Sequence, residues 1–221
     1  MIMRHSAGVF LSFEGIDGSG KSTQARMLAE ALRHLGHSVV LTREPGGSAG
    51  AEQIRRLVLE GDPDRWSPQT EILLFTAARR DHLEKTIRPA LAQGDIVITD
   101  RFADSTRMYQ GIARNGGPAL RCMVDQLHSL VIGVEPDVTF LIDIDAATGH
   151  ARATARDTVE LRFEEMGHDL QARMRTGFLE IAASNPNRIA VVDGARPVDA
   201  VATDVLARAQ AFLIAAGATP E

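Results

Sequence analysis

Short apolar segments alternate with longer amphipathic stretches along this chain. Five short segments are almost continuously apolar and are bounded by Gly, Pro or Asp, as expected for strands buried on both faces of a sheet. The strand candidates are Gly8–Phe13, Ser38–Thr42, Ile96–Thr99, Asp137–Asp143 and Arg188–Val192. The clearest helical stretches are Thr23–Leu35, Gln69–Ala92 and Asp199–Ile214. This alternation predicts an α/β fold with three layers, in which a parallel five-stranded sheet is flanked by helices.

Ala151–Glu165 fits the alternation less well. It is rich in arginine, threonine and acidic residues, and its apolar periodicity is weak. The pattern leaves two interpretations open, a mobile flap and a solvated helix. Because 221 residues suit one compact domain, we expect a single domain over residues 1–221 with this segment, about 151–165, inserted in it.

The bulk composition narrows the class of protein. A formal net charge of −5 argues against a DNA or RNA binder, which usually carries a basic face. Cys122 is the only cysteine, so no disulfide forms within the chain. The apolar run near the N-terminus is interrupted by Glu14 and is too short for a signal peptide or a transmembrane helix. We therefore expect a cytoplasmic protein with neither a nucleic-acid nor a membrane partner.

The strongest motif follows the first strand candidate. It matches the pattern GxxxxGK[ST] and opens a helical stretch, the context that supports such a match. The glycines let backbone N–H groups point at phosphate oxygens, and the helix N-terminus adds its positive dipole end. Lys21 is expected to reach the β- and γ-phosphates, and the Ser22 hydroxyl to ligate Mg²⁺. The expected ATP-binding residues are Gly15, Ile16, Asp17, Gly18, Ser19, Gly20, Lys21, Ser22 and Thr23.

Two other kinds of P-loop protein fit less well. A GTPase switch reads guanine with an Asn-Lys-x-Asp element, and no Asn-Lys pair occurs in this chain. A large mechanical ATPase usually needs a longer chain. The remaining class is a small phosphotransferase of the P-loop NTP hydrolase fold, which must hold a second phosphate in line with ATP.

Candidate groups for this second phosphate follow the third strand candidate. Ligands bind at the carboxyl ends of parallel strands, so Arg101 is expected to face the crevice. Asp100 either ligates Mg²⁺, directly or through water, or caps a helix or pairs with an arginine. On the preceding helix, Arg79 or Arg80 can point inward. Phe75 lies four residues before Arg79 and so shares its helix face, and core packing is the alternative role for this ring.

Several segments together resemble thymidylate kinases, specifically the bacterial type. The resemblance spans nearly the whole chain in the same order, and the combination is far more specific than the P-loop alone. The segments are FEGIDGSGKST at Phe13–Thr23, TREPGG at Thr42–Gly47, EILLFTAAR at Glu71–Arg79, IRPAL at Ile87–Leu91, DRFADSTRMYQG at Asp100–Gly111 and FLIDID ending at Asp145.

This resemblance implies a direct, in-line transfer of the γ-phosphoryl group of ATP to thymidine monophosphate (dTMP), giving dTDP and ADP. Phe75 would stack on the thymine ring, Arg79 would bridge to the base and phosphate, and Arg101 would grip the dTMP phosphate. Asp17 would approach the sugar 3′-OH and organise the phosphates, with a turn-stabilising aspartate as the alternative. The remaining acceptor-binding residues would be Arg43 and Pro45 in a loop with a cis Glu44–Pro45 peptide, Ser105 and Thr106 near the thymine edge, and Tyr109 and Gln110 at the sugar.

The resemblance also places a lid. Eukaryotic-type members carry an arginine at the P-loop position held here by Gly18, whereas bacterial-type members supply an arginine from the lid. Arg152, Arg156 and Arg162 are the lid candidates, and we expect Arg156 to stabilise the transition state beside the catalytic residues Lys21, Arg101 and Asp17. The expected Mg²⁺ ligands are Ser22, Asp100, Asp17 and Glu164, and adenine is expected near Asp193–Val198.

Three positions depart from the family pattern. Met108 stands where Ala is usual, Leu161 precedes Arg162 where Asp is usual, and Phe102 replaces a common Tyr or His. The alternatives to a dTMP kinase are a kinase for dUMP or a 5-modified dUMP and a non-catalytic nucleotide-binding subunit. The partners implied are ATP, dTMP and a second copy of the chain, for which Gly117–Val131 offers either a core helix or a homodimer face.

Overall fold

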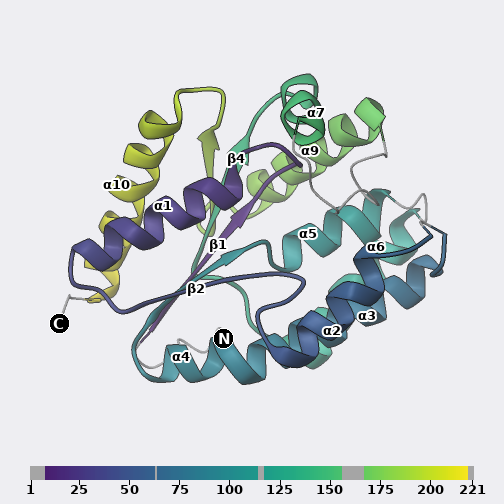
Figure 1. Ribbon diagram of the computed structural model, residues 1–221, viewed down its shortest axis with the longest axis horizontal. Helices are drawn as coiled ribbons and strands as arrows, with labels where there is room; N and C mark the ends of the chain where they lie inside the picture. The colour runs from purple at the N-terminus through teal and green to yellow at the C-terminus, as the bar shows by residue number, and fades with distance from the viewer. Residues whose placement is uncertain (1–7, 63, 114–116, 156–166, 219–221) are drawn as a thin grey trace.

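The structure is a computed structural model that describes residues 8–62, 64–113, 117–155 and 167–218. Five strands form one sheet, and every neighbouring pair is parallel. The strand order is β2-β3-β1-β4-β5, with β1 in the centre (Figure 1). The strands are β1 (Val9–Glu14), β2 (Val39–Arg43), β3 (Ile96–Asp100), β4 (Val138–Asp143) and β5 (Ile189–Asp193). The predicted α/β fold is confirmed, and each predicted strand lies within about one residue of the observed one.

Helices cover both faces of the sheet, and they separate into two layers. α1 and α10 lie side by side against one face, and the other helices pack on the opposite face and beyond the ends of the strands (Figure 1). The helices are α1 (Lys21–His34), α2 (Ala49–Leu59), α3 (Pro68–His82), η1 (Leu83–Ile87), α4 (Arg88–Ala92), α5 (Ala103–Met108), η2 (Tyr109–Ala113), α6 (Gly117–Leu127), η3 (His128–Ile132), α7 (Ala146–Thr154), α9 (Gly167–Ser184) and α10 (Val198–Ala216), where η marks a π-helical turn. In the described ranges, none of these helices combines the length and the apolar character needed to cross a bilayer.

Strand β1 shows how the two faces are built. Val9, Leu11 and Phe13 point at the α1–α10 layer, because alternate residues of a strand share a face. Phe10 points the other way into the core under η1 and α4. Glu14, four residues on, shares the face of Phe10 and therefore points away from α1. The Glu14 carboxylate therefore lies beneath the start of α5.

The expectation that every strand is buried on both faces is wrong for the outer strands. β2 and β5 are the edges of the sheet, and Leu41 and Val191 on them are exposed. The expectation holds for β1 and largely for β3 and β4. Apolar composition identified the strands, but it does not report their order in the sheet.

The helical stretch Gln69–Ala92 is confirmed with one irregularity. α3, η1 and α4 follow one another with helical backbone at each junction, so the chain runs on through a single π-helical turn. The poorly patterned stretch begins inside a helix, because Ala151–Thr154 is the last turn of α7. Residues 156–166 lie outside the described residues, so the choice between flap and helix stays open there.

Candidate active site

The motif Gly15–Ser22 forms the connection between β1 and α1. Lys21 is the first residue of α1, and Gly20 before it has a left-handed backbone with φ of 95°. The buried Lys21 ammonium donates to the carbonyl of Ile16 at 3.2 Å and lies 3.7 Å from Oδ1 of Asp17. The lysine is therefore folded back along the loop, at the N-terminus of a 14-residue helix, where phosphate binding is favoured.

Position 18 has to be a glycine because the P-loop lies in close contact with α7 there. Its φ is 75°, and a Cβ placed on it would lie 2.0 Å from the carbonyl oxygen of Gly149. A Cβ on Gly149 would in turn lie 2.8 Å from the carbonyl oxygen of Asp17. The loop and α7 thus meet backbone to backbone, which leaves no room at position 18 for an arginine side chain.

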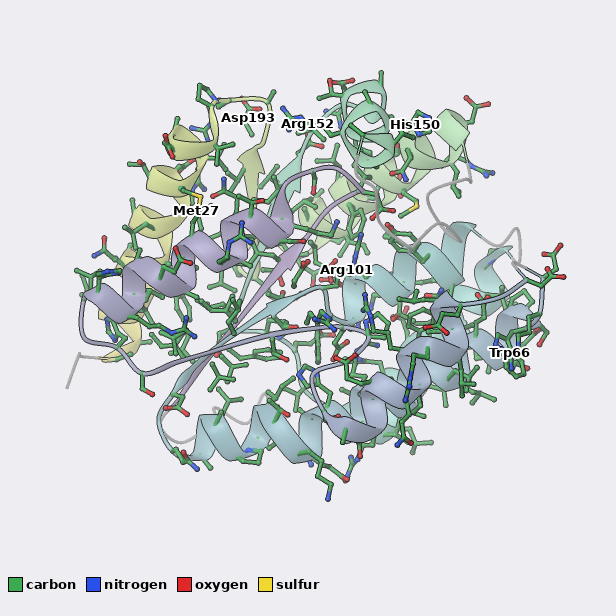
Figure 2. The ribbon with its side chains drawn as sticks, in the orientation of Figure 1. Met27, Trp66, Arg101, His150, Arg152 and Asp193 are labelled. Carbon is green, nitrogen blue, oxygen red and sulfur yellow. The ribbon has the colours of Figure 1, made fainter. Side chains whose placement is uncertain are left out.

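Arg101 joins the end of β3 to the loop. It has φ of 71°, the one positive value at a non-glycine residue in the described part of the chain. Its Nη1 donates to the Gly15 carbonyl at 3.2 Å and to Oγ of Ser105 at 2.8 Å. Its Nη2 donates to Oδ1 of Asp17 at 2.5 Å and to the Tyr109 hydroxyl at 3.0 Å. Arg101 lines the cavity described below, as predicted, and Figure 2 shows it near the centre of the view.

Asp17 has partners on both carboxylate oxygens. Arg101 occupies Oδ1, and the Tyr109 hydroxyl donates to Oδ2 at 2.6 Å. Burial alone would raise the pKa of Asp17, but Arg101, Lys21 and hydrogen bonds from Tyr109 and Gln171 lower it to about 2. Asp17 is therefore a carboxylate at neutral pH. Burial, and then this carboxylate, raise the pKa of Tyr109.

Arg79 is a buried arginine of α3. Its Nε donates to Oε2 of Glu44 at 2.7 Å, and its Nη2 donates to the Phe102 carbonyl at 3.1 Å and to Oγ1 of Thr106 at 2.8 Å. Its guanidinium also lies 5.0 Å from the centre of the Phe102 ring. Arg80 points outward and pairs with Glu84, so Arg79 is the inward member of the predicted pair.

Glu14 anchors the segment that carries Arg101. Its Oε1 accepts hydrogen bonds from the backbone N–H groups of Phe102 at 2.8 Å and Ser105 at 3.1 Å, and its Oε2 accepts from Oγ of Ser105 at 2.6 Å. Burial and then the nearby Asp104 raise the pKa of Glu14 to about 7, against the opposing charge of Arg101. Ser105 thereby links this carboxylate to the guanidinium of Arg101.

These groups surround a cavity of about 520 Å³ at the carboxyl ends of the strands. Every predicted acceptor-binding residue lines it, together with part of the P-loop. The lining comprises Asp17, Gly18, Lys21, Ser22, Arg43, Glu44, Pro45, Arg55, Leu59, Phe75, Arg79, Asp100, Arg101, Phe102, Ser105, Thr106, Tyr109, Gln110 and Ala153. Phe75 both lines the cavity and packs with the buried Met108, so its two proposed roles are compatible. The Glu44–Pro45 peptide is cis, as predicted.

A metal ion has suitable donors at one place in this cavity. Oδ1 of Asp100 is buried and has no hydrogen-bond partner, and Ser22 lines the same cavity. The described residues contain no group of three His, Cys, Asp or Glu side chains placed to hold a metal. A P-loop site does not need one, because Mg²⁺ there takes a hydroxyl, one carboxylate, phosphate oxygens and water. The residues present therefore fit Mg²⁺ bound together with a nucleotide.

The predicted lid residues are only partly described. Arg152 does not line the cavity, and its Nη1 lies 3.5 Å from the carbonyl oxygen of Gly194. Figure 2 shows Arg152 and Asp193 near one another at the rim of the molecule, away from Arg101. Arg156, Arg162 and Glu164 lie outside the described residues.

Sequence reasoning assigned no role to four residues around the cavity. Glu14 could have been recognised from the sequence, because an acidic residue at the end of a buried apolar strand is unusual and points to a specific role. Glu44 lies within a quoted segment, and His82 follows Arg79 by three residues and so shares its helix face. Arg55 donates to the Pro45 carbonyl at 2.6 Å, and no pattern in the chain marked it.

The parallel sheet and the loop between β1 and α1 define the class of P-loop nucleotide-binding proteins. The family model for thymidylate kinase matches residues 13–205. The chain is similar to the thymidylate kinase of Ruegeria pomeroyi, with 67% identity over 198 residues that cover 90% of this chain and 92% of that protein. It is also similar to the thymidylate kinase of Dinoroseobacter shibae, with 64% identity over 200 residues that cover 90% and 95% of the two chains.

Comparison with solved structures agrees. The crystal structure of thymidylate kinase from Ehrlichia chaffeensis has a TM-score of 0.71 and 39% identity, and the match covers 90% of this chain and 97% of that one. The chain belongs to the thymidylate kinase family.

Proposed function

We propose that this chain catalyses transfer of the γ-phosphoryl group of ATP to dTMP, giving dTDP and ADP. One observation carries the proposal within the family: Arg79 and Arg101 converge with Lys21 on a single cavity. Two phosphate-bearing ligands in that cavity would lie on the P-loop side and on the arginine side. Such a reaction needs little covalent chemistry from the protein, because positioning and charge stabilisation supply most of the rate.

On the donor side, backbone N–H groups of the loop and the N-terminus of α1 would bind the ATP phosphates. Lys21 would move from the Ile16 carbonyl to the β- and γ-phosphates. Ser22 and Asp100 would hold Mg²⁺, which when bound neutralises charge on the phosphate oxygens. Asp17 would position Arg101 and the acceptor sugar rather than take a metal, since both of its oxygens already have partners.

On the acceptor side, Phe75 would stack on thymine, with Ser105 and Thr106 near its edge, and Gln110 would support Tyr109 at the sugar. Oδ1 of Asp100 and Nε2 of Gln110 are buried in the cavity wall without partners, so ligand or metal atoms would satisfy them. The Tyr109 hydroxyl is fixed by Asp17 and Arg101 and would stand against the sugar, where it disfavours a ribose 2′-OH. Arg101 would take the dTMP phosphate, and Arg79 would contact both phosphate and base.

The lid assignment remains part of the proposal. Arg156 would supply the transition-state charge, with Arg162 next in order and Glu164 assisting Mg²⁺ or holding the lid. The packing of Gly18 against Gly149 supports this view, because the loop has no room for an arginine of its own. Arg152 beside the Gly194 carbonyl would mark the adenine end of the donor site.

We also propose a single cytoplasmic domain that forms a homodimer. Leu73 on α3 and Leu130 on η3 support a protein contact, because these large apolar side chains are 51% and 80% exposed. Light scattering on the wild type and on Leu130→Glu tests the homodimer. A wild-type monomer would exclude it.

The reaction is tested by measuring ADP release with dTMP, dUMP, dCMP and UMP, each against a blank without acceptor. We expect the highest kcat/KM with dTMP and negligible release in the blank. A preference for dUMP would replace dTMP as the substrate. ATP binding without ADP release for every acceptor would favour a non-catalytic nucleotide-binding subunit.

A further inference from the structure

His82, a fully buried residue at the end of α3, forms the centre around which the Glu44–Gly47 loop is wrapped. Its Nδ1 lies 3.0 Å from Oε1 of Glu44, and its Nε2 lies 2.8 Å from Oγ1 of Thr42. Gly47 closes over the second contact. A Cβ on Gly47 would lie 2.4 Å from Nε2 of His82 and 2.3 Å from Oγ1 of Thr42. The imidazole therefore has no space to rotate and two fixed polar partners.

The partners determine which nitrogen carries the proton. Burial alone would raise the pKa of Glu44, but Arg79 and the hydrogen bond from His82 lower it, so Glu44 is a carboxylate and can only accept. Nδ1 of His82 must then be the donor. In the neutral ring Nε2 accepts from the Thr42 hydroxyl, and this hydrogen bond selects the tautomer that Glu44 requires.

The two carboxylate oxygens of Glu44 have different partners, His82 and Arg79. Its Oε1 accepts from His82, while its Oε2 accepts from Nε of Arg79 at 2.7 Å. Nη2 of Arg79 is occupied by the Phe102 carbonyl and Thr106, and Nη1 has no hydrogen-bond partner among the described residues. Because Arg79 lines the cavity, this arrangement leaves one edge of the guanidinium available to a ligand.

We propose that His82 is a positioning residue for the acceptor nucleotide, which acts through Glu44 to hold Arg79 with Nη1 directed into the cavity. The inference rests on the proposed acceptor-binding role of Arg79. His82 itself lies beneath the cavity wall and touches no ligand. Without its hydrogen bond, the Glu44 carboxylate can rotate to accept from both Nε and Nη2 of Arg79, which share one edge of the guanidinium. Nη2 is then drawn away from the Phe102 carbonyl and Thr106, and the direction of Nη1 toward the acceptor changes with it.

Two substitutions separate this role from packing. His82→Asn keeps a donor near the position of Nδ1, and His82→Leu fills similar space with no donor. KM for dTMP, KM for ATP and kcat are measured by ADP release, and the melting temperature is measured for each variant. We expect His82→Leu to raise KM for dTMP about 10-fold, with KM for ATP and kcat within about 2-fold. His82→Asn should recover most of that loss.

Thr42→Val is the second route, because it leaves the histidine in place and removes the hydroxyl that fixes its tautomer. We expect KM for dTMP to rise about 3-fold, again without change in KM for ATP. This variant keeps the test available if His82→Leu does not fold. Equal KM values for His82→Asn and His82→Leu, or an equal rise in both substrates' KM, would overturn the inference.

Arg79→Lys distinguishes failure of this inference from failure of the proposed function. If Arg79→Lys raises KM for dTMP while the His82 and Thr42 variants do not, the acceptor site stands and the role of His82 is wrong. If none of the variants changes KM for dTMP, Arg79 does not bind the acceptor, and both statements fall.

Discussion

Asp17 and Arg101 are in direct contact, with Oδ1 and Nη2 2.5 Å apart across 84 positions of the chain. The contact ties the P-loop to the end of β3, and the Tyr109 hydroxyl closes a triangle with both. A donor-side loop and an acceptor-side arginine therefore share one partly buried charge pair. The free energy of unfolding should therefore change with pH as Asp17 of this pair is protonated.

Replacing Asp17 with Asn should lower the free energy of unfolding at pH 7 by about 2 kcal/mol. The pKa of Asp17 is lowered to about 2 in the folded protein, so its contribution is fully present above the unfolded value near 4. The contribution is lost as the pH falls through 2. Urea unfolding at pH 7, 4 and 2.5 should show the difference between wild type and variant shrinking. A difference that stays constant over this range would contradict the assignment.

The contribution of Glu14 to the free energy of unfolding changes with pH in the opposite direction to that of Asp17. Burial and then Asp104 raise its pKa to about 7, so its favourable contribution is complete below about 4.5 and is lost as the pH rises through 7. Glu14→Gln imitates the neutral form: its Oε1 still accepts from the two backbone N–H groups, and its Nε2 donates to Oγ of Ser105 in place of the contact in which Oε2 accepted. Relative to wild type, the variant should therefore gain about 3 kcal/mol between pH 5 and pH 8.

The measurement is the free energy of unfolding at both pH values, with the exposed Glu30→Gln as the matched control. The control should follow the wild type. Parallel curves for wild type and Glu14→Gln would show that this carboxyl group does not titrate in that interval.

Gly149→Ala tests the contact between α7 and the P-loop. Alanine normally stabilises a helix interior by about 1 kcal/mol relative to glycine. Here its Cβ would lie 2.8 Å from the Asp17 carbonyl oxygen, so we expect destabilisation by about 1–3 kcal/mol and a raised KM for ATP. Ala151→Gly, at an exposed position of the same helix, is the control and should lose about 1 kcal/mol without affecting KM. A more stable Gly149→Ala with normal KM would refute the contact.

Phe75→Ala removes the ring that lines the acceptor side. Base–aromatic stacking is worth roughly 1–3 kcal/mol, so KM for dTMP should rise about 5- to 150-fold. KM for ATP should change little, because the ring is not part of the P-loop. Gln69→Ala, at an exposed position of the same helix, is the control. If the two variants show the same kinetics, Phe75 serves packing alone.

Local patterns were enough to predict the strands, the P-loop and an inward arginine at position 79 or 80, because each depends on residues within one turn or one strand. The choice of Arg79 came from the family resemblance. Glu14, Glu44 and His82 were not predicted as site residues, since their roles come from contacts with segments 35–91 positions away. The outward faces of β2 and β5 also escaped prediction, because edge positions follow from strand order and not from composition. Gly149 is a similar case, since its sequence context carries no sign of the loop it touches.

The whole arrangement rests on two nucleotides facing each other across the cavity between Lys21 and the pair Arg79 and Arg101. A crystal structure with dTMP and a non-hydrolysable ATP analogue is the decisive measurement. We predict thymine against Phe75, the dTMP phosphate on Arg101 and the γ-phosphate analogue on Lys21. A structure in which dTMP binds elsewhere, or in which Arg79 and Arg101 turn away from the cavity that Lys21 faces, would contradict the proposed function.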